Sequence, residues 1–154
     1  MEELAQRKRV KSKVDRMADG LGRSVDEGIK SMVITLNILG FQTIQSCEGH
    51  LKRALPYPWV WITQCIVGGV SSSEKMSQLL DSFSKLNPEH NLFMVPRGTR
   101  GDFKLQCNKD YSTEEVEKIP ISLRRRMLSS TREDMNAFCD FLESHIEQPS
   151  VNLS

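Results

Sequence analysis

The chain has 154 residues, with 21 Lys or Arg against 20 Asp or Glu, so its formal net charge at pH 7 is +1. This length fits one domain with its own hydrophobic core, and it excludes a miniature scaffold that needs disulfides or a metal to fold. The balanced charge excludes a uniformly basic nucleic-acid binder, although a local basic patch can be hidden in the total.

The first 23 residues carry an excess of positive charge that the balanced total does not reveal. Residues 1–23 hold seven basic and four acidic side chains, a net charge of +3. We predict a charged helical segment over residues 1–22, a single domain over 23–147 and a flexible tail over 148–154. The basic segment can meet a phosphate backbone or can be an ordinary solvated helix face.

Four serines are each followed three residues later by a glutamate, a pattern typical of helix starts because the two side chains satisfy free backbone N–H groups. The pairs are Ser24/Glu27, Ser71/Glu74, Ser112/Glu115 and Ser130/Glu133. Apolar residues at helical spacing follow three of these Ser/Glu pairs. They predict helices over 25–39, 72–86 and 131–146, and a shorter one after Ser112 that stops before Pro120.

Four segments have strand character, and their ranges are 41–46, 59–67, 92–95 and 103–107. The third and fourth are joined by residues 96–102, whose glycines suit a hairpin turn. The order of elements predicts an α+β fold, with a small antiparallel or mixed sheet of about four strands and helices packed on one face.

The chain begins without the apolar core of a secretion signal, and no apolar run reaches the roughly 18 residues that span a membrane. We therefore expect a cytoplasmic protein with no membrane partner. Its four cysteines form no C-x-x-C pair, which indicates reduced thiols. Cys107 and Cys139 lie on apolar faces and are predicted to be small buried hydrophobes.

Polar and reactive side chains concentrate in the run Ser46-Cys47-Glu48-Gly49-His50, just past a predicted strand. Gly49 lets the backbone turn sharply and bring its amides to a ligand. We therefore place a ligand-binding or catalytic pocket at this turn, with Cys47, Glu48 and His50 as catalytic candidates and Ser46 and Gly49 as ligand-binding ones.

Several chemistries remain open at this turn. Cys47 can act as a thiolate nucleophile activated by His50, or Glu48 or His50 can be a general base. Cys47 and His50 can also be half of a zinc site, with Cys65 or His90 completing it. Because one such pair is only half a site, no metal is assigned, and the run can also be just a structured turn.

Two neighbouring features bear on partners. Trp59 and Trp61 are two apart on a predicted strand and share one face, where they either stack a planar ligand or cover the helices as core aromatics. Arg97 and Arg100, in the predicted hairpin turn, can hold a phosphate or carboxylate, or can simply be solvated.

The run resembles two known patterns. A group of small microbial proteins has a helix ending in Asn-x-x-Gly, a strand, Ser-Cys-Glu-Gly-His and then Pro-Trp-Val, and the matching residues here are Asn37, Gly40, Thr43, Ser46 to His50 and Pro58 to Val60. That resemblance implies no activity. More remotely, Thr-x-x-Ser-Cys-x-Gly is similar to the Ser-Cys-Ser-Gly-Arg motif of the wybutosine-synthesising tRNA methyltransferase family.

The second resemblance implies that Ser46, Cys47 and Gly49 lie in a pocket for substrate or S-adenosylmethionine. The chain departs from that family at Glu48 and His50, where the family has Ser and Arg. Beside the ligand or catalytic pocket, two functions therefore stay open. One is an RNA- or DNA-interacting module or tRNA-modification protein that uses the N-terminal segment and arginines 97, 100 and 124–126, and the other is a structural or protein-interaction domain. The sequence identifies no cofactor.

Overall fold

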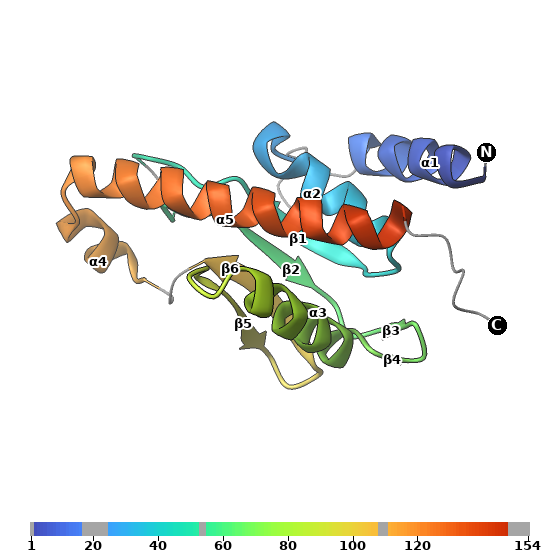
Figure 1. The fold of residues 1–154 in the computed structure, drawn as a ribbon. Coiled ribbons are helices and arrows are strands. Elements are labelled where there is room, and N and C mark those ends of the chain that lie inside the picture. The colour runs from blue at the N-terminus through green and yellow to red at the C-terminus, as the bar shows by residue number, and fades with distance from the viewer. Residues whose placement is uncertain (1, 17–24, 53–54, 108–110, 148–154) are drawn as a thin grey trace.

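The structure, a computed structural model, describes residues 2–16, 25–52, 55–107 and 111–147 (Figure 1). Within them, helices α1 and α2 precede a region of strands. In chain order, the elements are α1 Glu2–Arg16, α2 Glu27–Ile38, β1 Thr43–Cys47, β2 Trp59–Ile62, β3 Ile66–Val67, β4 Val70–Ser71, α3 Ser72–Leu86, β5 Leu92–Arg97, β6 Asp102–Cys107, α4 Thr113–Lys118 and α5 Ile121–Glu147.

The main sheet has four strands in the order β1-β2-β6-β5, and every neighbouring pair is antiparallel. Helices α2, α3 and α5 pack on one face of it, which confirms the predicted α+β fold (Figure 1). The hydrophobic core lies between these two layers. Its largest fully buried side chains include Phe41, Phe83, Phe138, Leu36, Leu105 and Ile62.

The predicted hairpin is confirmed. Strands β5 and β6 pair from Leu92 with Cys107 to Arg97 with Asp102. The turn between them contains Gly98 and Gly101, whose φ angles of 69° and 91° lie in the left-handed region that glycine adopts without strain.

The predicted strand over 59–67 is wrong, because the chain there forms two short strands in different sheets. β2 ends at Ile62, and β3 pairs instead with β4 in a separate two-stranded ribbon. Gly68 and Gly69, both at positive φ, supply the two-residue turn that this ribbon needs. The first strand is also shifted, since β1 begins at Thr43 and Phe41 is a buried core residue before it.

Two of the predicted helix starts are confirmed. Ser71 accepts a hydrogen bond from the Glu74 backbone N–H at the start of α3, and Ser112 and Glu115 form a full capping box at the start of the short helix α4. Ser24 lies outside the described residues, and α2 begins at Glu27 with Asp26 as its N-cap.

The predicted helix start at Ser130 is wrong. Ser130 lies in the middle of α5, which runs without a break for 27 residues from Ile121. Pro120 marks the true start, because a proline has no N–H to donate and is tolerated at a helix beginning. The Ser130/Glu133 spacing therefore lies inside a continuous helix and does not mark a helix start.

Helix α1 packs along α2 (Figure 1). Val14 of α1 is fully buried and belongs to the hydrophobic core, and Asp15 forms an ion pair with Lys30 of α2. One face of the charged N-terminal segment is therefore attached to the domain. None of the described helices is long and apolar enough to cross a membrane.

Candidate functional site

The turn after β1 is shaped by Gly49. Its φ is +85°, and a Cβ added there would lie 2.8 Å from the backbone carbon of Tyr57 and 2.6 Å from the Leu128 side chain. A side chain at this position would therefore be strained and would also clash with backbone. The backbone N–H of His50 then donates to the carbonyl of Leu55 at 3.0 Å and closes the following loop.

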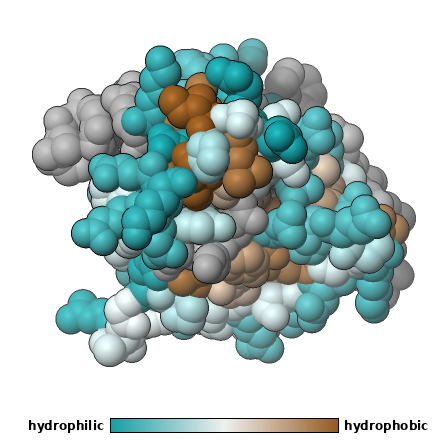
Figure 2. All heavy atoms as spheres, turned by 90° about the vertical axis from the view of Figure 1, so that its left-hand side faces the viewer, coloured by the Kyte–Doolittle hydropathy of each residue, from teal (hydrophilic) through white to brown (hydrophobic). Residues whose placement is uncertain are grey.

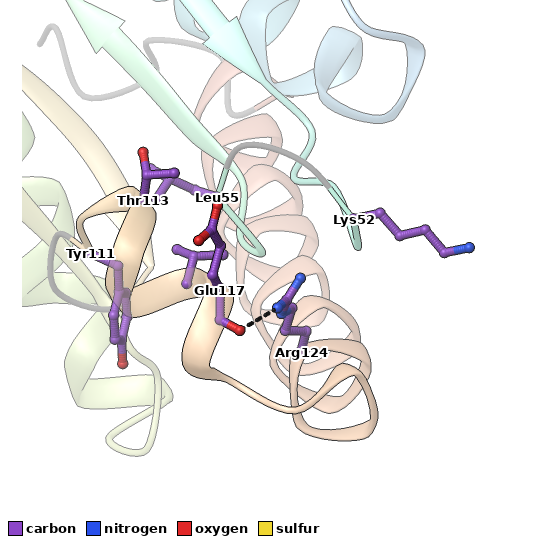
Figure 3. Close-up of a pocket in the computed structure, with 7 residues that line it drawn as sticks. Lys52, Leu55, Tyr111, Thr113, Glu117 and Arg124 are labelled. Carbon is purple, nitrogen blue, oxygen red and sulfur yellow. Dashed lines mark hydrogen bonds between the residues drawn. The ribbon is translucent and has the colours of Figure 1, made fainter.

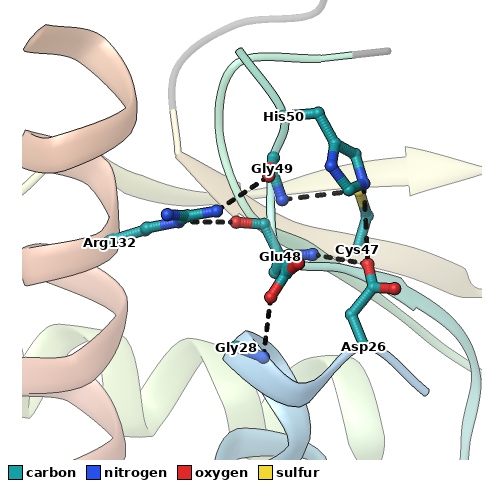
Figure 4. Close-up of polar contacts among 7 residues, drawn as sticks. All are labelled: Asp26, Gly28, Cys47, Glu48, Gly49, His50 and Arg132. Carbon is teal, nitrogen blue, oxygen red and sulfur yellow. Dashed lines mark hydrogen bonds and ion pairs between the residues drawn. The ribbon is translucent and has the colours of Figure 1, made fainter. Parts of the chain in front are cut away.

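A reciprocal pair of hydrogen bonds connects this turn to the start of α2 (Figure 4). The Glu48 carboxylate accepts from the Gly28 backbone N–H at 2.7 Å, and the Glu48 backbone N–H donates to the Asp26 carboxylate at 3.1 Å. A carboxylate is favoured at a helix N-terminus, where backbone N–H groups lack partners. Gly28 is needed there because a Cβ would occupy the place of the Glu48 carboxylate.

Helix α5 holds the turn from the other side. Arg132 donates to the carbonyl of Glu48 at 3.0 Å and to the carbonyl of Gly49 at 2.9 Å (Figure 4). The planar guanidinium suits two neighbouring acceptors, and hydrogen bonds from a charged donor are stronger than neutral ones. Three elements, β1, α2 and α5, therefore fix the conformation of the turn.

The turn brings Cys47 and His50 together with Asp26. One candidate ligand atom from each of the three lies within 4.8 Å of the other two. The His50 Nε2 is 3.7 Å from the Asp26 carboxylate, toward which the ring points in Figure 4. Cys47 is 7% exposed, and its sulfur accepts from the Gly49 backbone N–H at 3.4 Å. This cluster of a thiol, an imidazole and a carboxylate is the candidate functional site.

The five residues of the motif have different tasks in this geometry. Cys47 and His50 present reactive atoms, whereas Glu48 turns away to α2 and positions the turn. Ser46 lies within β1 opposite Val60 and is not one of the three converging donors. Asp26 was not foreseen as a site residue.

Cys65 and His90, the two residues considered as completing a zinc site, do not belong to this cluster. The Cys65 thiol donates to the carbonyl of Gly40. The Nδ1 of His90 accepts from the Leu92 backbone N–H at 2.9 Å, so Nε2 carries the proton and donates to Ser84 at 2.6 Å. Because Ser84 in turn donates to the carbonyl of Leu80, this Ser–His contact is structural.

Trp59 and Trp61 share one face of the sheet, as predicted. Val60 and Ile62 alternate with them and are fully buried in the core, so the two half-buried indoles lie on the opposite face and are not core aromatics under the helices. The Nζ of Lys104 lies 4.0 Å from the Trp59 ring centroid and 5.9 Å from that of Trp61. Trp59 also pairs with Cys47 across the two strands, which brings this face beside the cluster.

The predicted arginine patch is split between two ends of the sheet. Arg97 ends β5 and Arg100 lies in the β5–β6 turn, where Gly101 approaches Gln64, just after the end of β2. Arg124 lies toward the beginning of β2. Its guanidinium donates to the carbonyls of Ile119, Glu117 and Leu51, and it therefore ties α4, α5 and the loop before β2 together.

A cavity of about 360 Å³ lies near Arg124, between this loop and α4 (Figure 3). Its lining mixes apolar and polar groups, while Lys52 points away from the other lining residues in the close-up. The lining residues are Lys52, Leu55, Tyr111, Thr113, Val116, Glu117 and Arg124. Figure 2 faces this end of the molecule and shows apolar surface among hydrophilic side chains. Ile121 and Leu123, at the start of α5, are each 44% exposed.

The two thiols predicted to be buried hydrophobes are buried. Burial, and more weakly the Asp134 carboxylate, raise the pKa of Cys107 well above its usual range. Burial is also the main cause that raises the pKa of Cys139 to about 11. Both thiols therefore stay protonated at neutral pH and are poor nucleophiles or metal ligands.

Comparisons with family models, with curated proteins and with solved structures give no match to this chain. The functional argument therefore depends on the residues themselves.

Proposed function

We propose that this protein binds a small ligand or substrate at the cluster of Asp26, Cys47 and His50, and that these groups do its chemistry. The convergence of their three reactive atoms within 4.8 Å carries the proposal. A strand end, a helix start and a second helix combine to hold this convergence.

The roles within the proposed site follow from the contacts. Cys47 and His50 face the ligand, Asp26 lies beside His50, and Glu48 with Arg132 positions the turn without touching the ligand. Preorganised donors and acceptors of this kind reduce the entropy lost when a ligand binds.

Native mass spectrometry of the protein purified from its own source tests this proposal. We expect the wild-type chain to retain a bound species that Cys47→Ser and His50→Ala both lose, while far-UV circular dichroism stays unchanged. Cys65→Ser is the matched control, because it makes the same change at a thiol that lies outside the cluster. Retention of the same species by both cluster variants would place the site elsewhere.

A second candidate is an RNA-interacting protein of the tRNA-modification type, which the resemblance to the tRNA methyltransferase family suggests. The observation that favours it is the pair Trp59 and Trp61 on the face of the sheet away from the core, with Lys104 beside both rings. Bases stack on such aromatic rings, and a lysine adds attraction to phosphate. Within the described chain, the buried indole N–H of Trp61 also has no hydrogen-bond partner, so a ligand acceptor would satisfy it.

Titration with a single-stranded RNA oligonucleotide tests this candidate by quenching of tryptophan fluorescence. We expect binding that weakens steeply with salt, and Trp59→Ala and Lys104→Ala each to weaken it about tenfold. Lys118→Ala, on the exposed surface of α4, is the charge-matched control. Binding that is absent, or that all three variants leave unchanged, would exclude this face as an RNA platform.

A further inference from the structure

We propose that Asp26, Cys47 and His50 bind a divalent transition-metal ion, Zn²⁺ by the chemistry of the donors, and leave one coordination position open. This inference deepens the proposed function and rests on the same cluster. It names the group through which these side chains would bind their ligand.

The first support is the spacing of the donor atoms. The 3.7 Å between His50 Nε2 and the Asp26 carboxylate is too long for a hydrogen bond. Two ligand atoms that share a tetrahedral zinc ion, with bonds of about 2.0–2.2 Å, lie about 3.4 Å apart. The observed separation is therefore close to that of two ligands of one metal ion, and the sulfur of Cys47 lies within the same 4.8 Å limit.

The second support is the kind of donor. A thiolate, an imidazole and a carboxylate together match Zn²⁺ and related first-row ions, whereas Mg²⁺ and Ca²⁺ prefer oxygen atoms alone. A thiolate and a carboxylate also neutralise the two charges of the ion. Three protein ligands with a fourth position open is the arrangement of catalytic zinc sites, in contrast to the four protein ligands of structural ones.

The third support is the set of backbone hydrogen bonds to the proposed ligand atoms. The Gly49 N–H donates to the Cys47 sulfur, and the Glu48 N–H donates to the Asp26 carboxylate. Outer contacts of this kind orient metal ligands and contribute to their affinity. Here they come from the backbone of the turn that carries two of the ligands, so the fold of the turn and the geometry of the site are set together.

A nucleophilic triad is the competing interpretation of the same residues. In such a triad, the carboxylate accepts the imidazole N–H directly, as an orienting partner. The separation of 3.7 Å does not provide that bond. The metal interpretation instead accounts for the observed spacing between Asp26 and His50.

Titration of chelator-treated, metal-free protein with ZnCl₂, and separately with CoCl₂, tests the inference. We expect one ion per chain, and a thiolate-to-cobalt charge-transfer absorption that Cys47→Ser removes. Cys47→Ser and His50→Ala should each weaken Zn²⁺ binding at least a hundredfold. Asp26→Asn should weaken it at least tenfold, because the amide can still accept from Glu48 but is a poor ligand. Cys65→Ser should leave it unchanged.

A variant of Glu48, which holds the turn but is not a proposed ligand, distinguishes the two kinds of residue. Glu48→Gln keeps an acceptor for the Gly28 N–H, so it should weaken Zn²⁺ binding less than the variants of Asp26, Cys47 and His50 do.

Binding that Asp26→Asn leaves unchanged, or the absence of one-to-one binding in the folded protein, would overturn the inference. If Zn²⁺ does not bind but His50→Ala still abolishes retention of the native ligand, the metal inference fails and the proposed ligand site stands. If neither effect occurs, both fail.

Discussion

Gly49 determines whether the turn that carries the candidate site can form. At this position a side chain meets both an unfavourable φ of +85° and the backbone of Tyr57 at 2.8 Å. We predict that Gly49→Ala lowers the free energy of unfolding by about 2 to 3 kcal/mol, measured by chemical denaturation. Gly69 has the same φ of +85° and open space around it, so Gly69→Ala should lose only about 1 kcal/mol. Equal losses would mean that close packing at Gly49 contributes nothing.

The thiols are expected to separate into two classes. Because burial raises the pKa of Cys107, and raises that of Cys139 to about 11, their thiolate fractions are negligible at neutral pH. Iodoacetamide at pH 7.5 should therefore leave both unmodified in the folded protein, while the half-buried Cys65 reacts. Peptide mass spectrometry measures this, with the denatured chain as the control in which all the cysteines react. Fast modification of Cys139 in the native state would contradict its burial.

At the candidate site, the sequence singles out residues whose neighbours along the chain are unusual. Cys47 and His50 stand out because polar groups surround a glycine at a strand end. Asp26 carried no comparable signal, since acidic residues are common before helices and it is 21 positions from Cys47. Only the packing of α2 against the turn brings it to the site, and the same packing assigns Glu48 to positioning.

At the scale of elements, an ion pair fastens α1 to α2. The hydrogen bond from Lys30 is the largest cause that lowers the pKa of Asp15, and Asp15 and Glu27 raise the pKa of Lys30. A lowered acid pKa stabilises the folded state above the unfolded value and loses this effect as the pH falls. A raised lysine pKa stabilises below its unfolded value and loses this effect as the pH rises. The pair therefore acts between about pH 4 and about pH 10.

We predict that Asp15→Asn speeds amide hydrogen exchange in α1 at pH 7, because the helix loses its charged contact with α2. As the pH falls through the lowered pKa of Asp15, the carboxylate becomes protonated and the variant and the wild type should converge. Asp81→Asn, on the exposed surface of α3, is the matched control and should leave α1 unchanged. Equal exchange in α1 at pH 7 would show that the other contacts of α1, among them the burial of Val14, hold the helix in place without this ion pair.

The sequence predicted helix starts correctly where neighbouring residues alone determine the start. Ser71 and Ser112 cap helices because nothing precedes them that continues the helix. Ser130 has the same pattern but follows helical residues, and a capping box cannot form when its first residue is already inside a helix. The division of residues 59–67 between two sheets depends on Gly68 and Gly69, whose turn signal lies just beyond the predicted strand.

At the scale of the whole molecule, the composition of the elements indicated an α+β fold, but not the strand order. The neighbours in β1-β2-β6-β5 are partly distant in sequence, and only long-range pairing determines them. The same limit applies to Trp59 and Trp61. Alternation placed them on one face, but which face the helices cover follows from the burial of Val60 and Ile62.

The packing of α3 against α5 depends on one aromatic side chain. Phe83 is 1% exposed, and its ring centroid lies 5.0 Å from that of Phe138 and 5.4 Å from that of Phe141. Removing it leaves a cavity at the meeting point of two helices that the neighbouring rings cannot easily fill. We therefore predict that Phe83→Ala lowers the free energy of unfolding by about 3 to 5 kcal/mol in urea titration.

Leu86 provides the control for this prediction, because it ends the same helix and is 69% exposed. Leu86→Ala should change the free energy of unfolding by less than about 0.5 kcal/mol. The Phe83 loss should appear as a lower urea midpoint with an unchanged slope, since the slope follows the surface exposed when the whole chain unfolds. A transition that splits into two steps would instead mean that α3 unfolds apart from α5, and that the single core described for this chain is two weakly coupled ones.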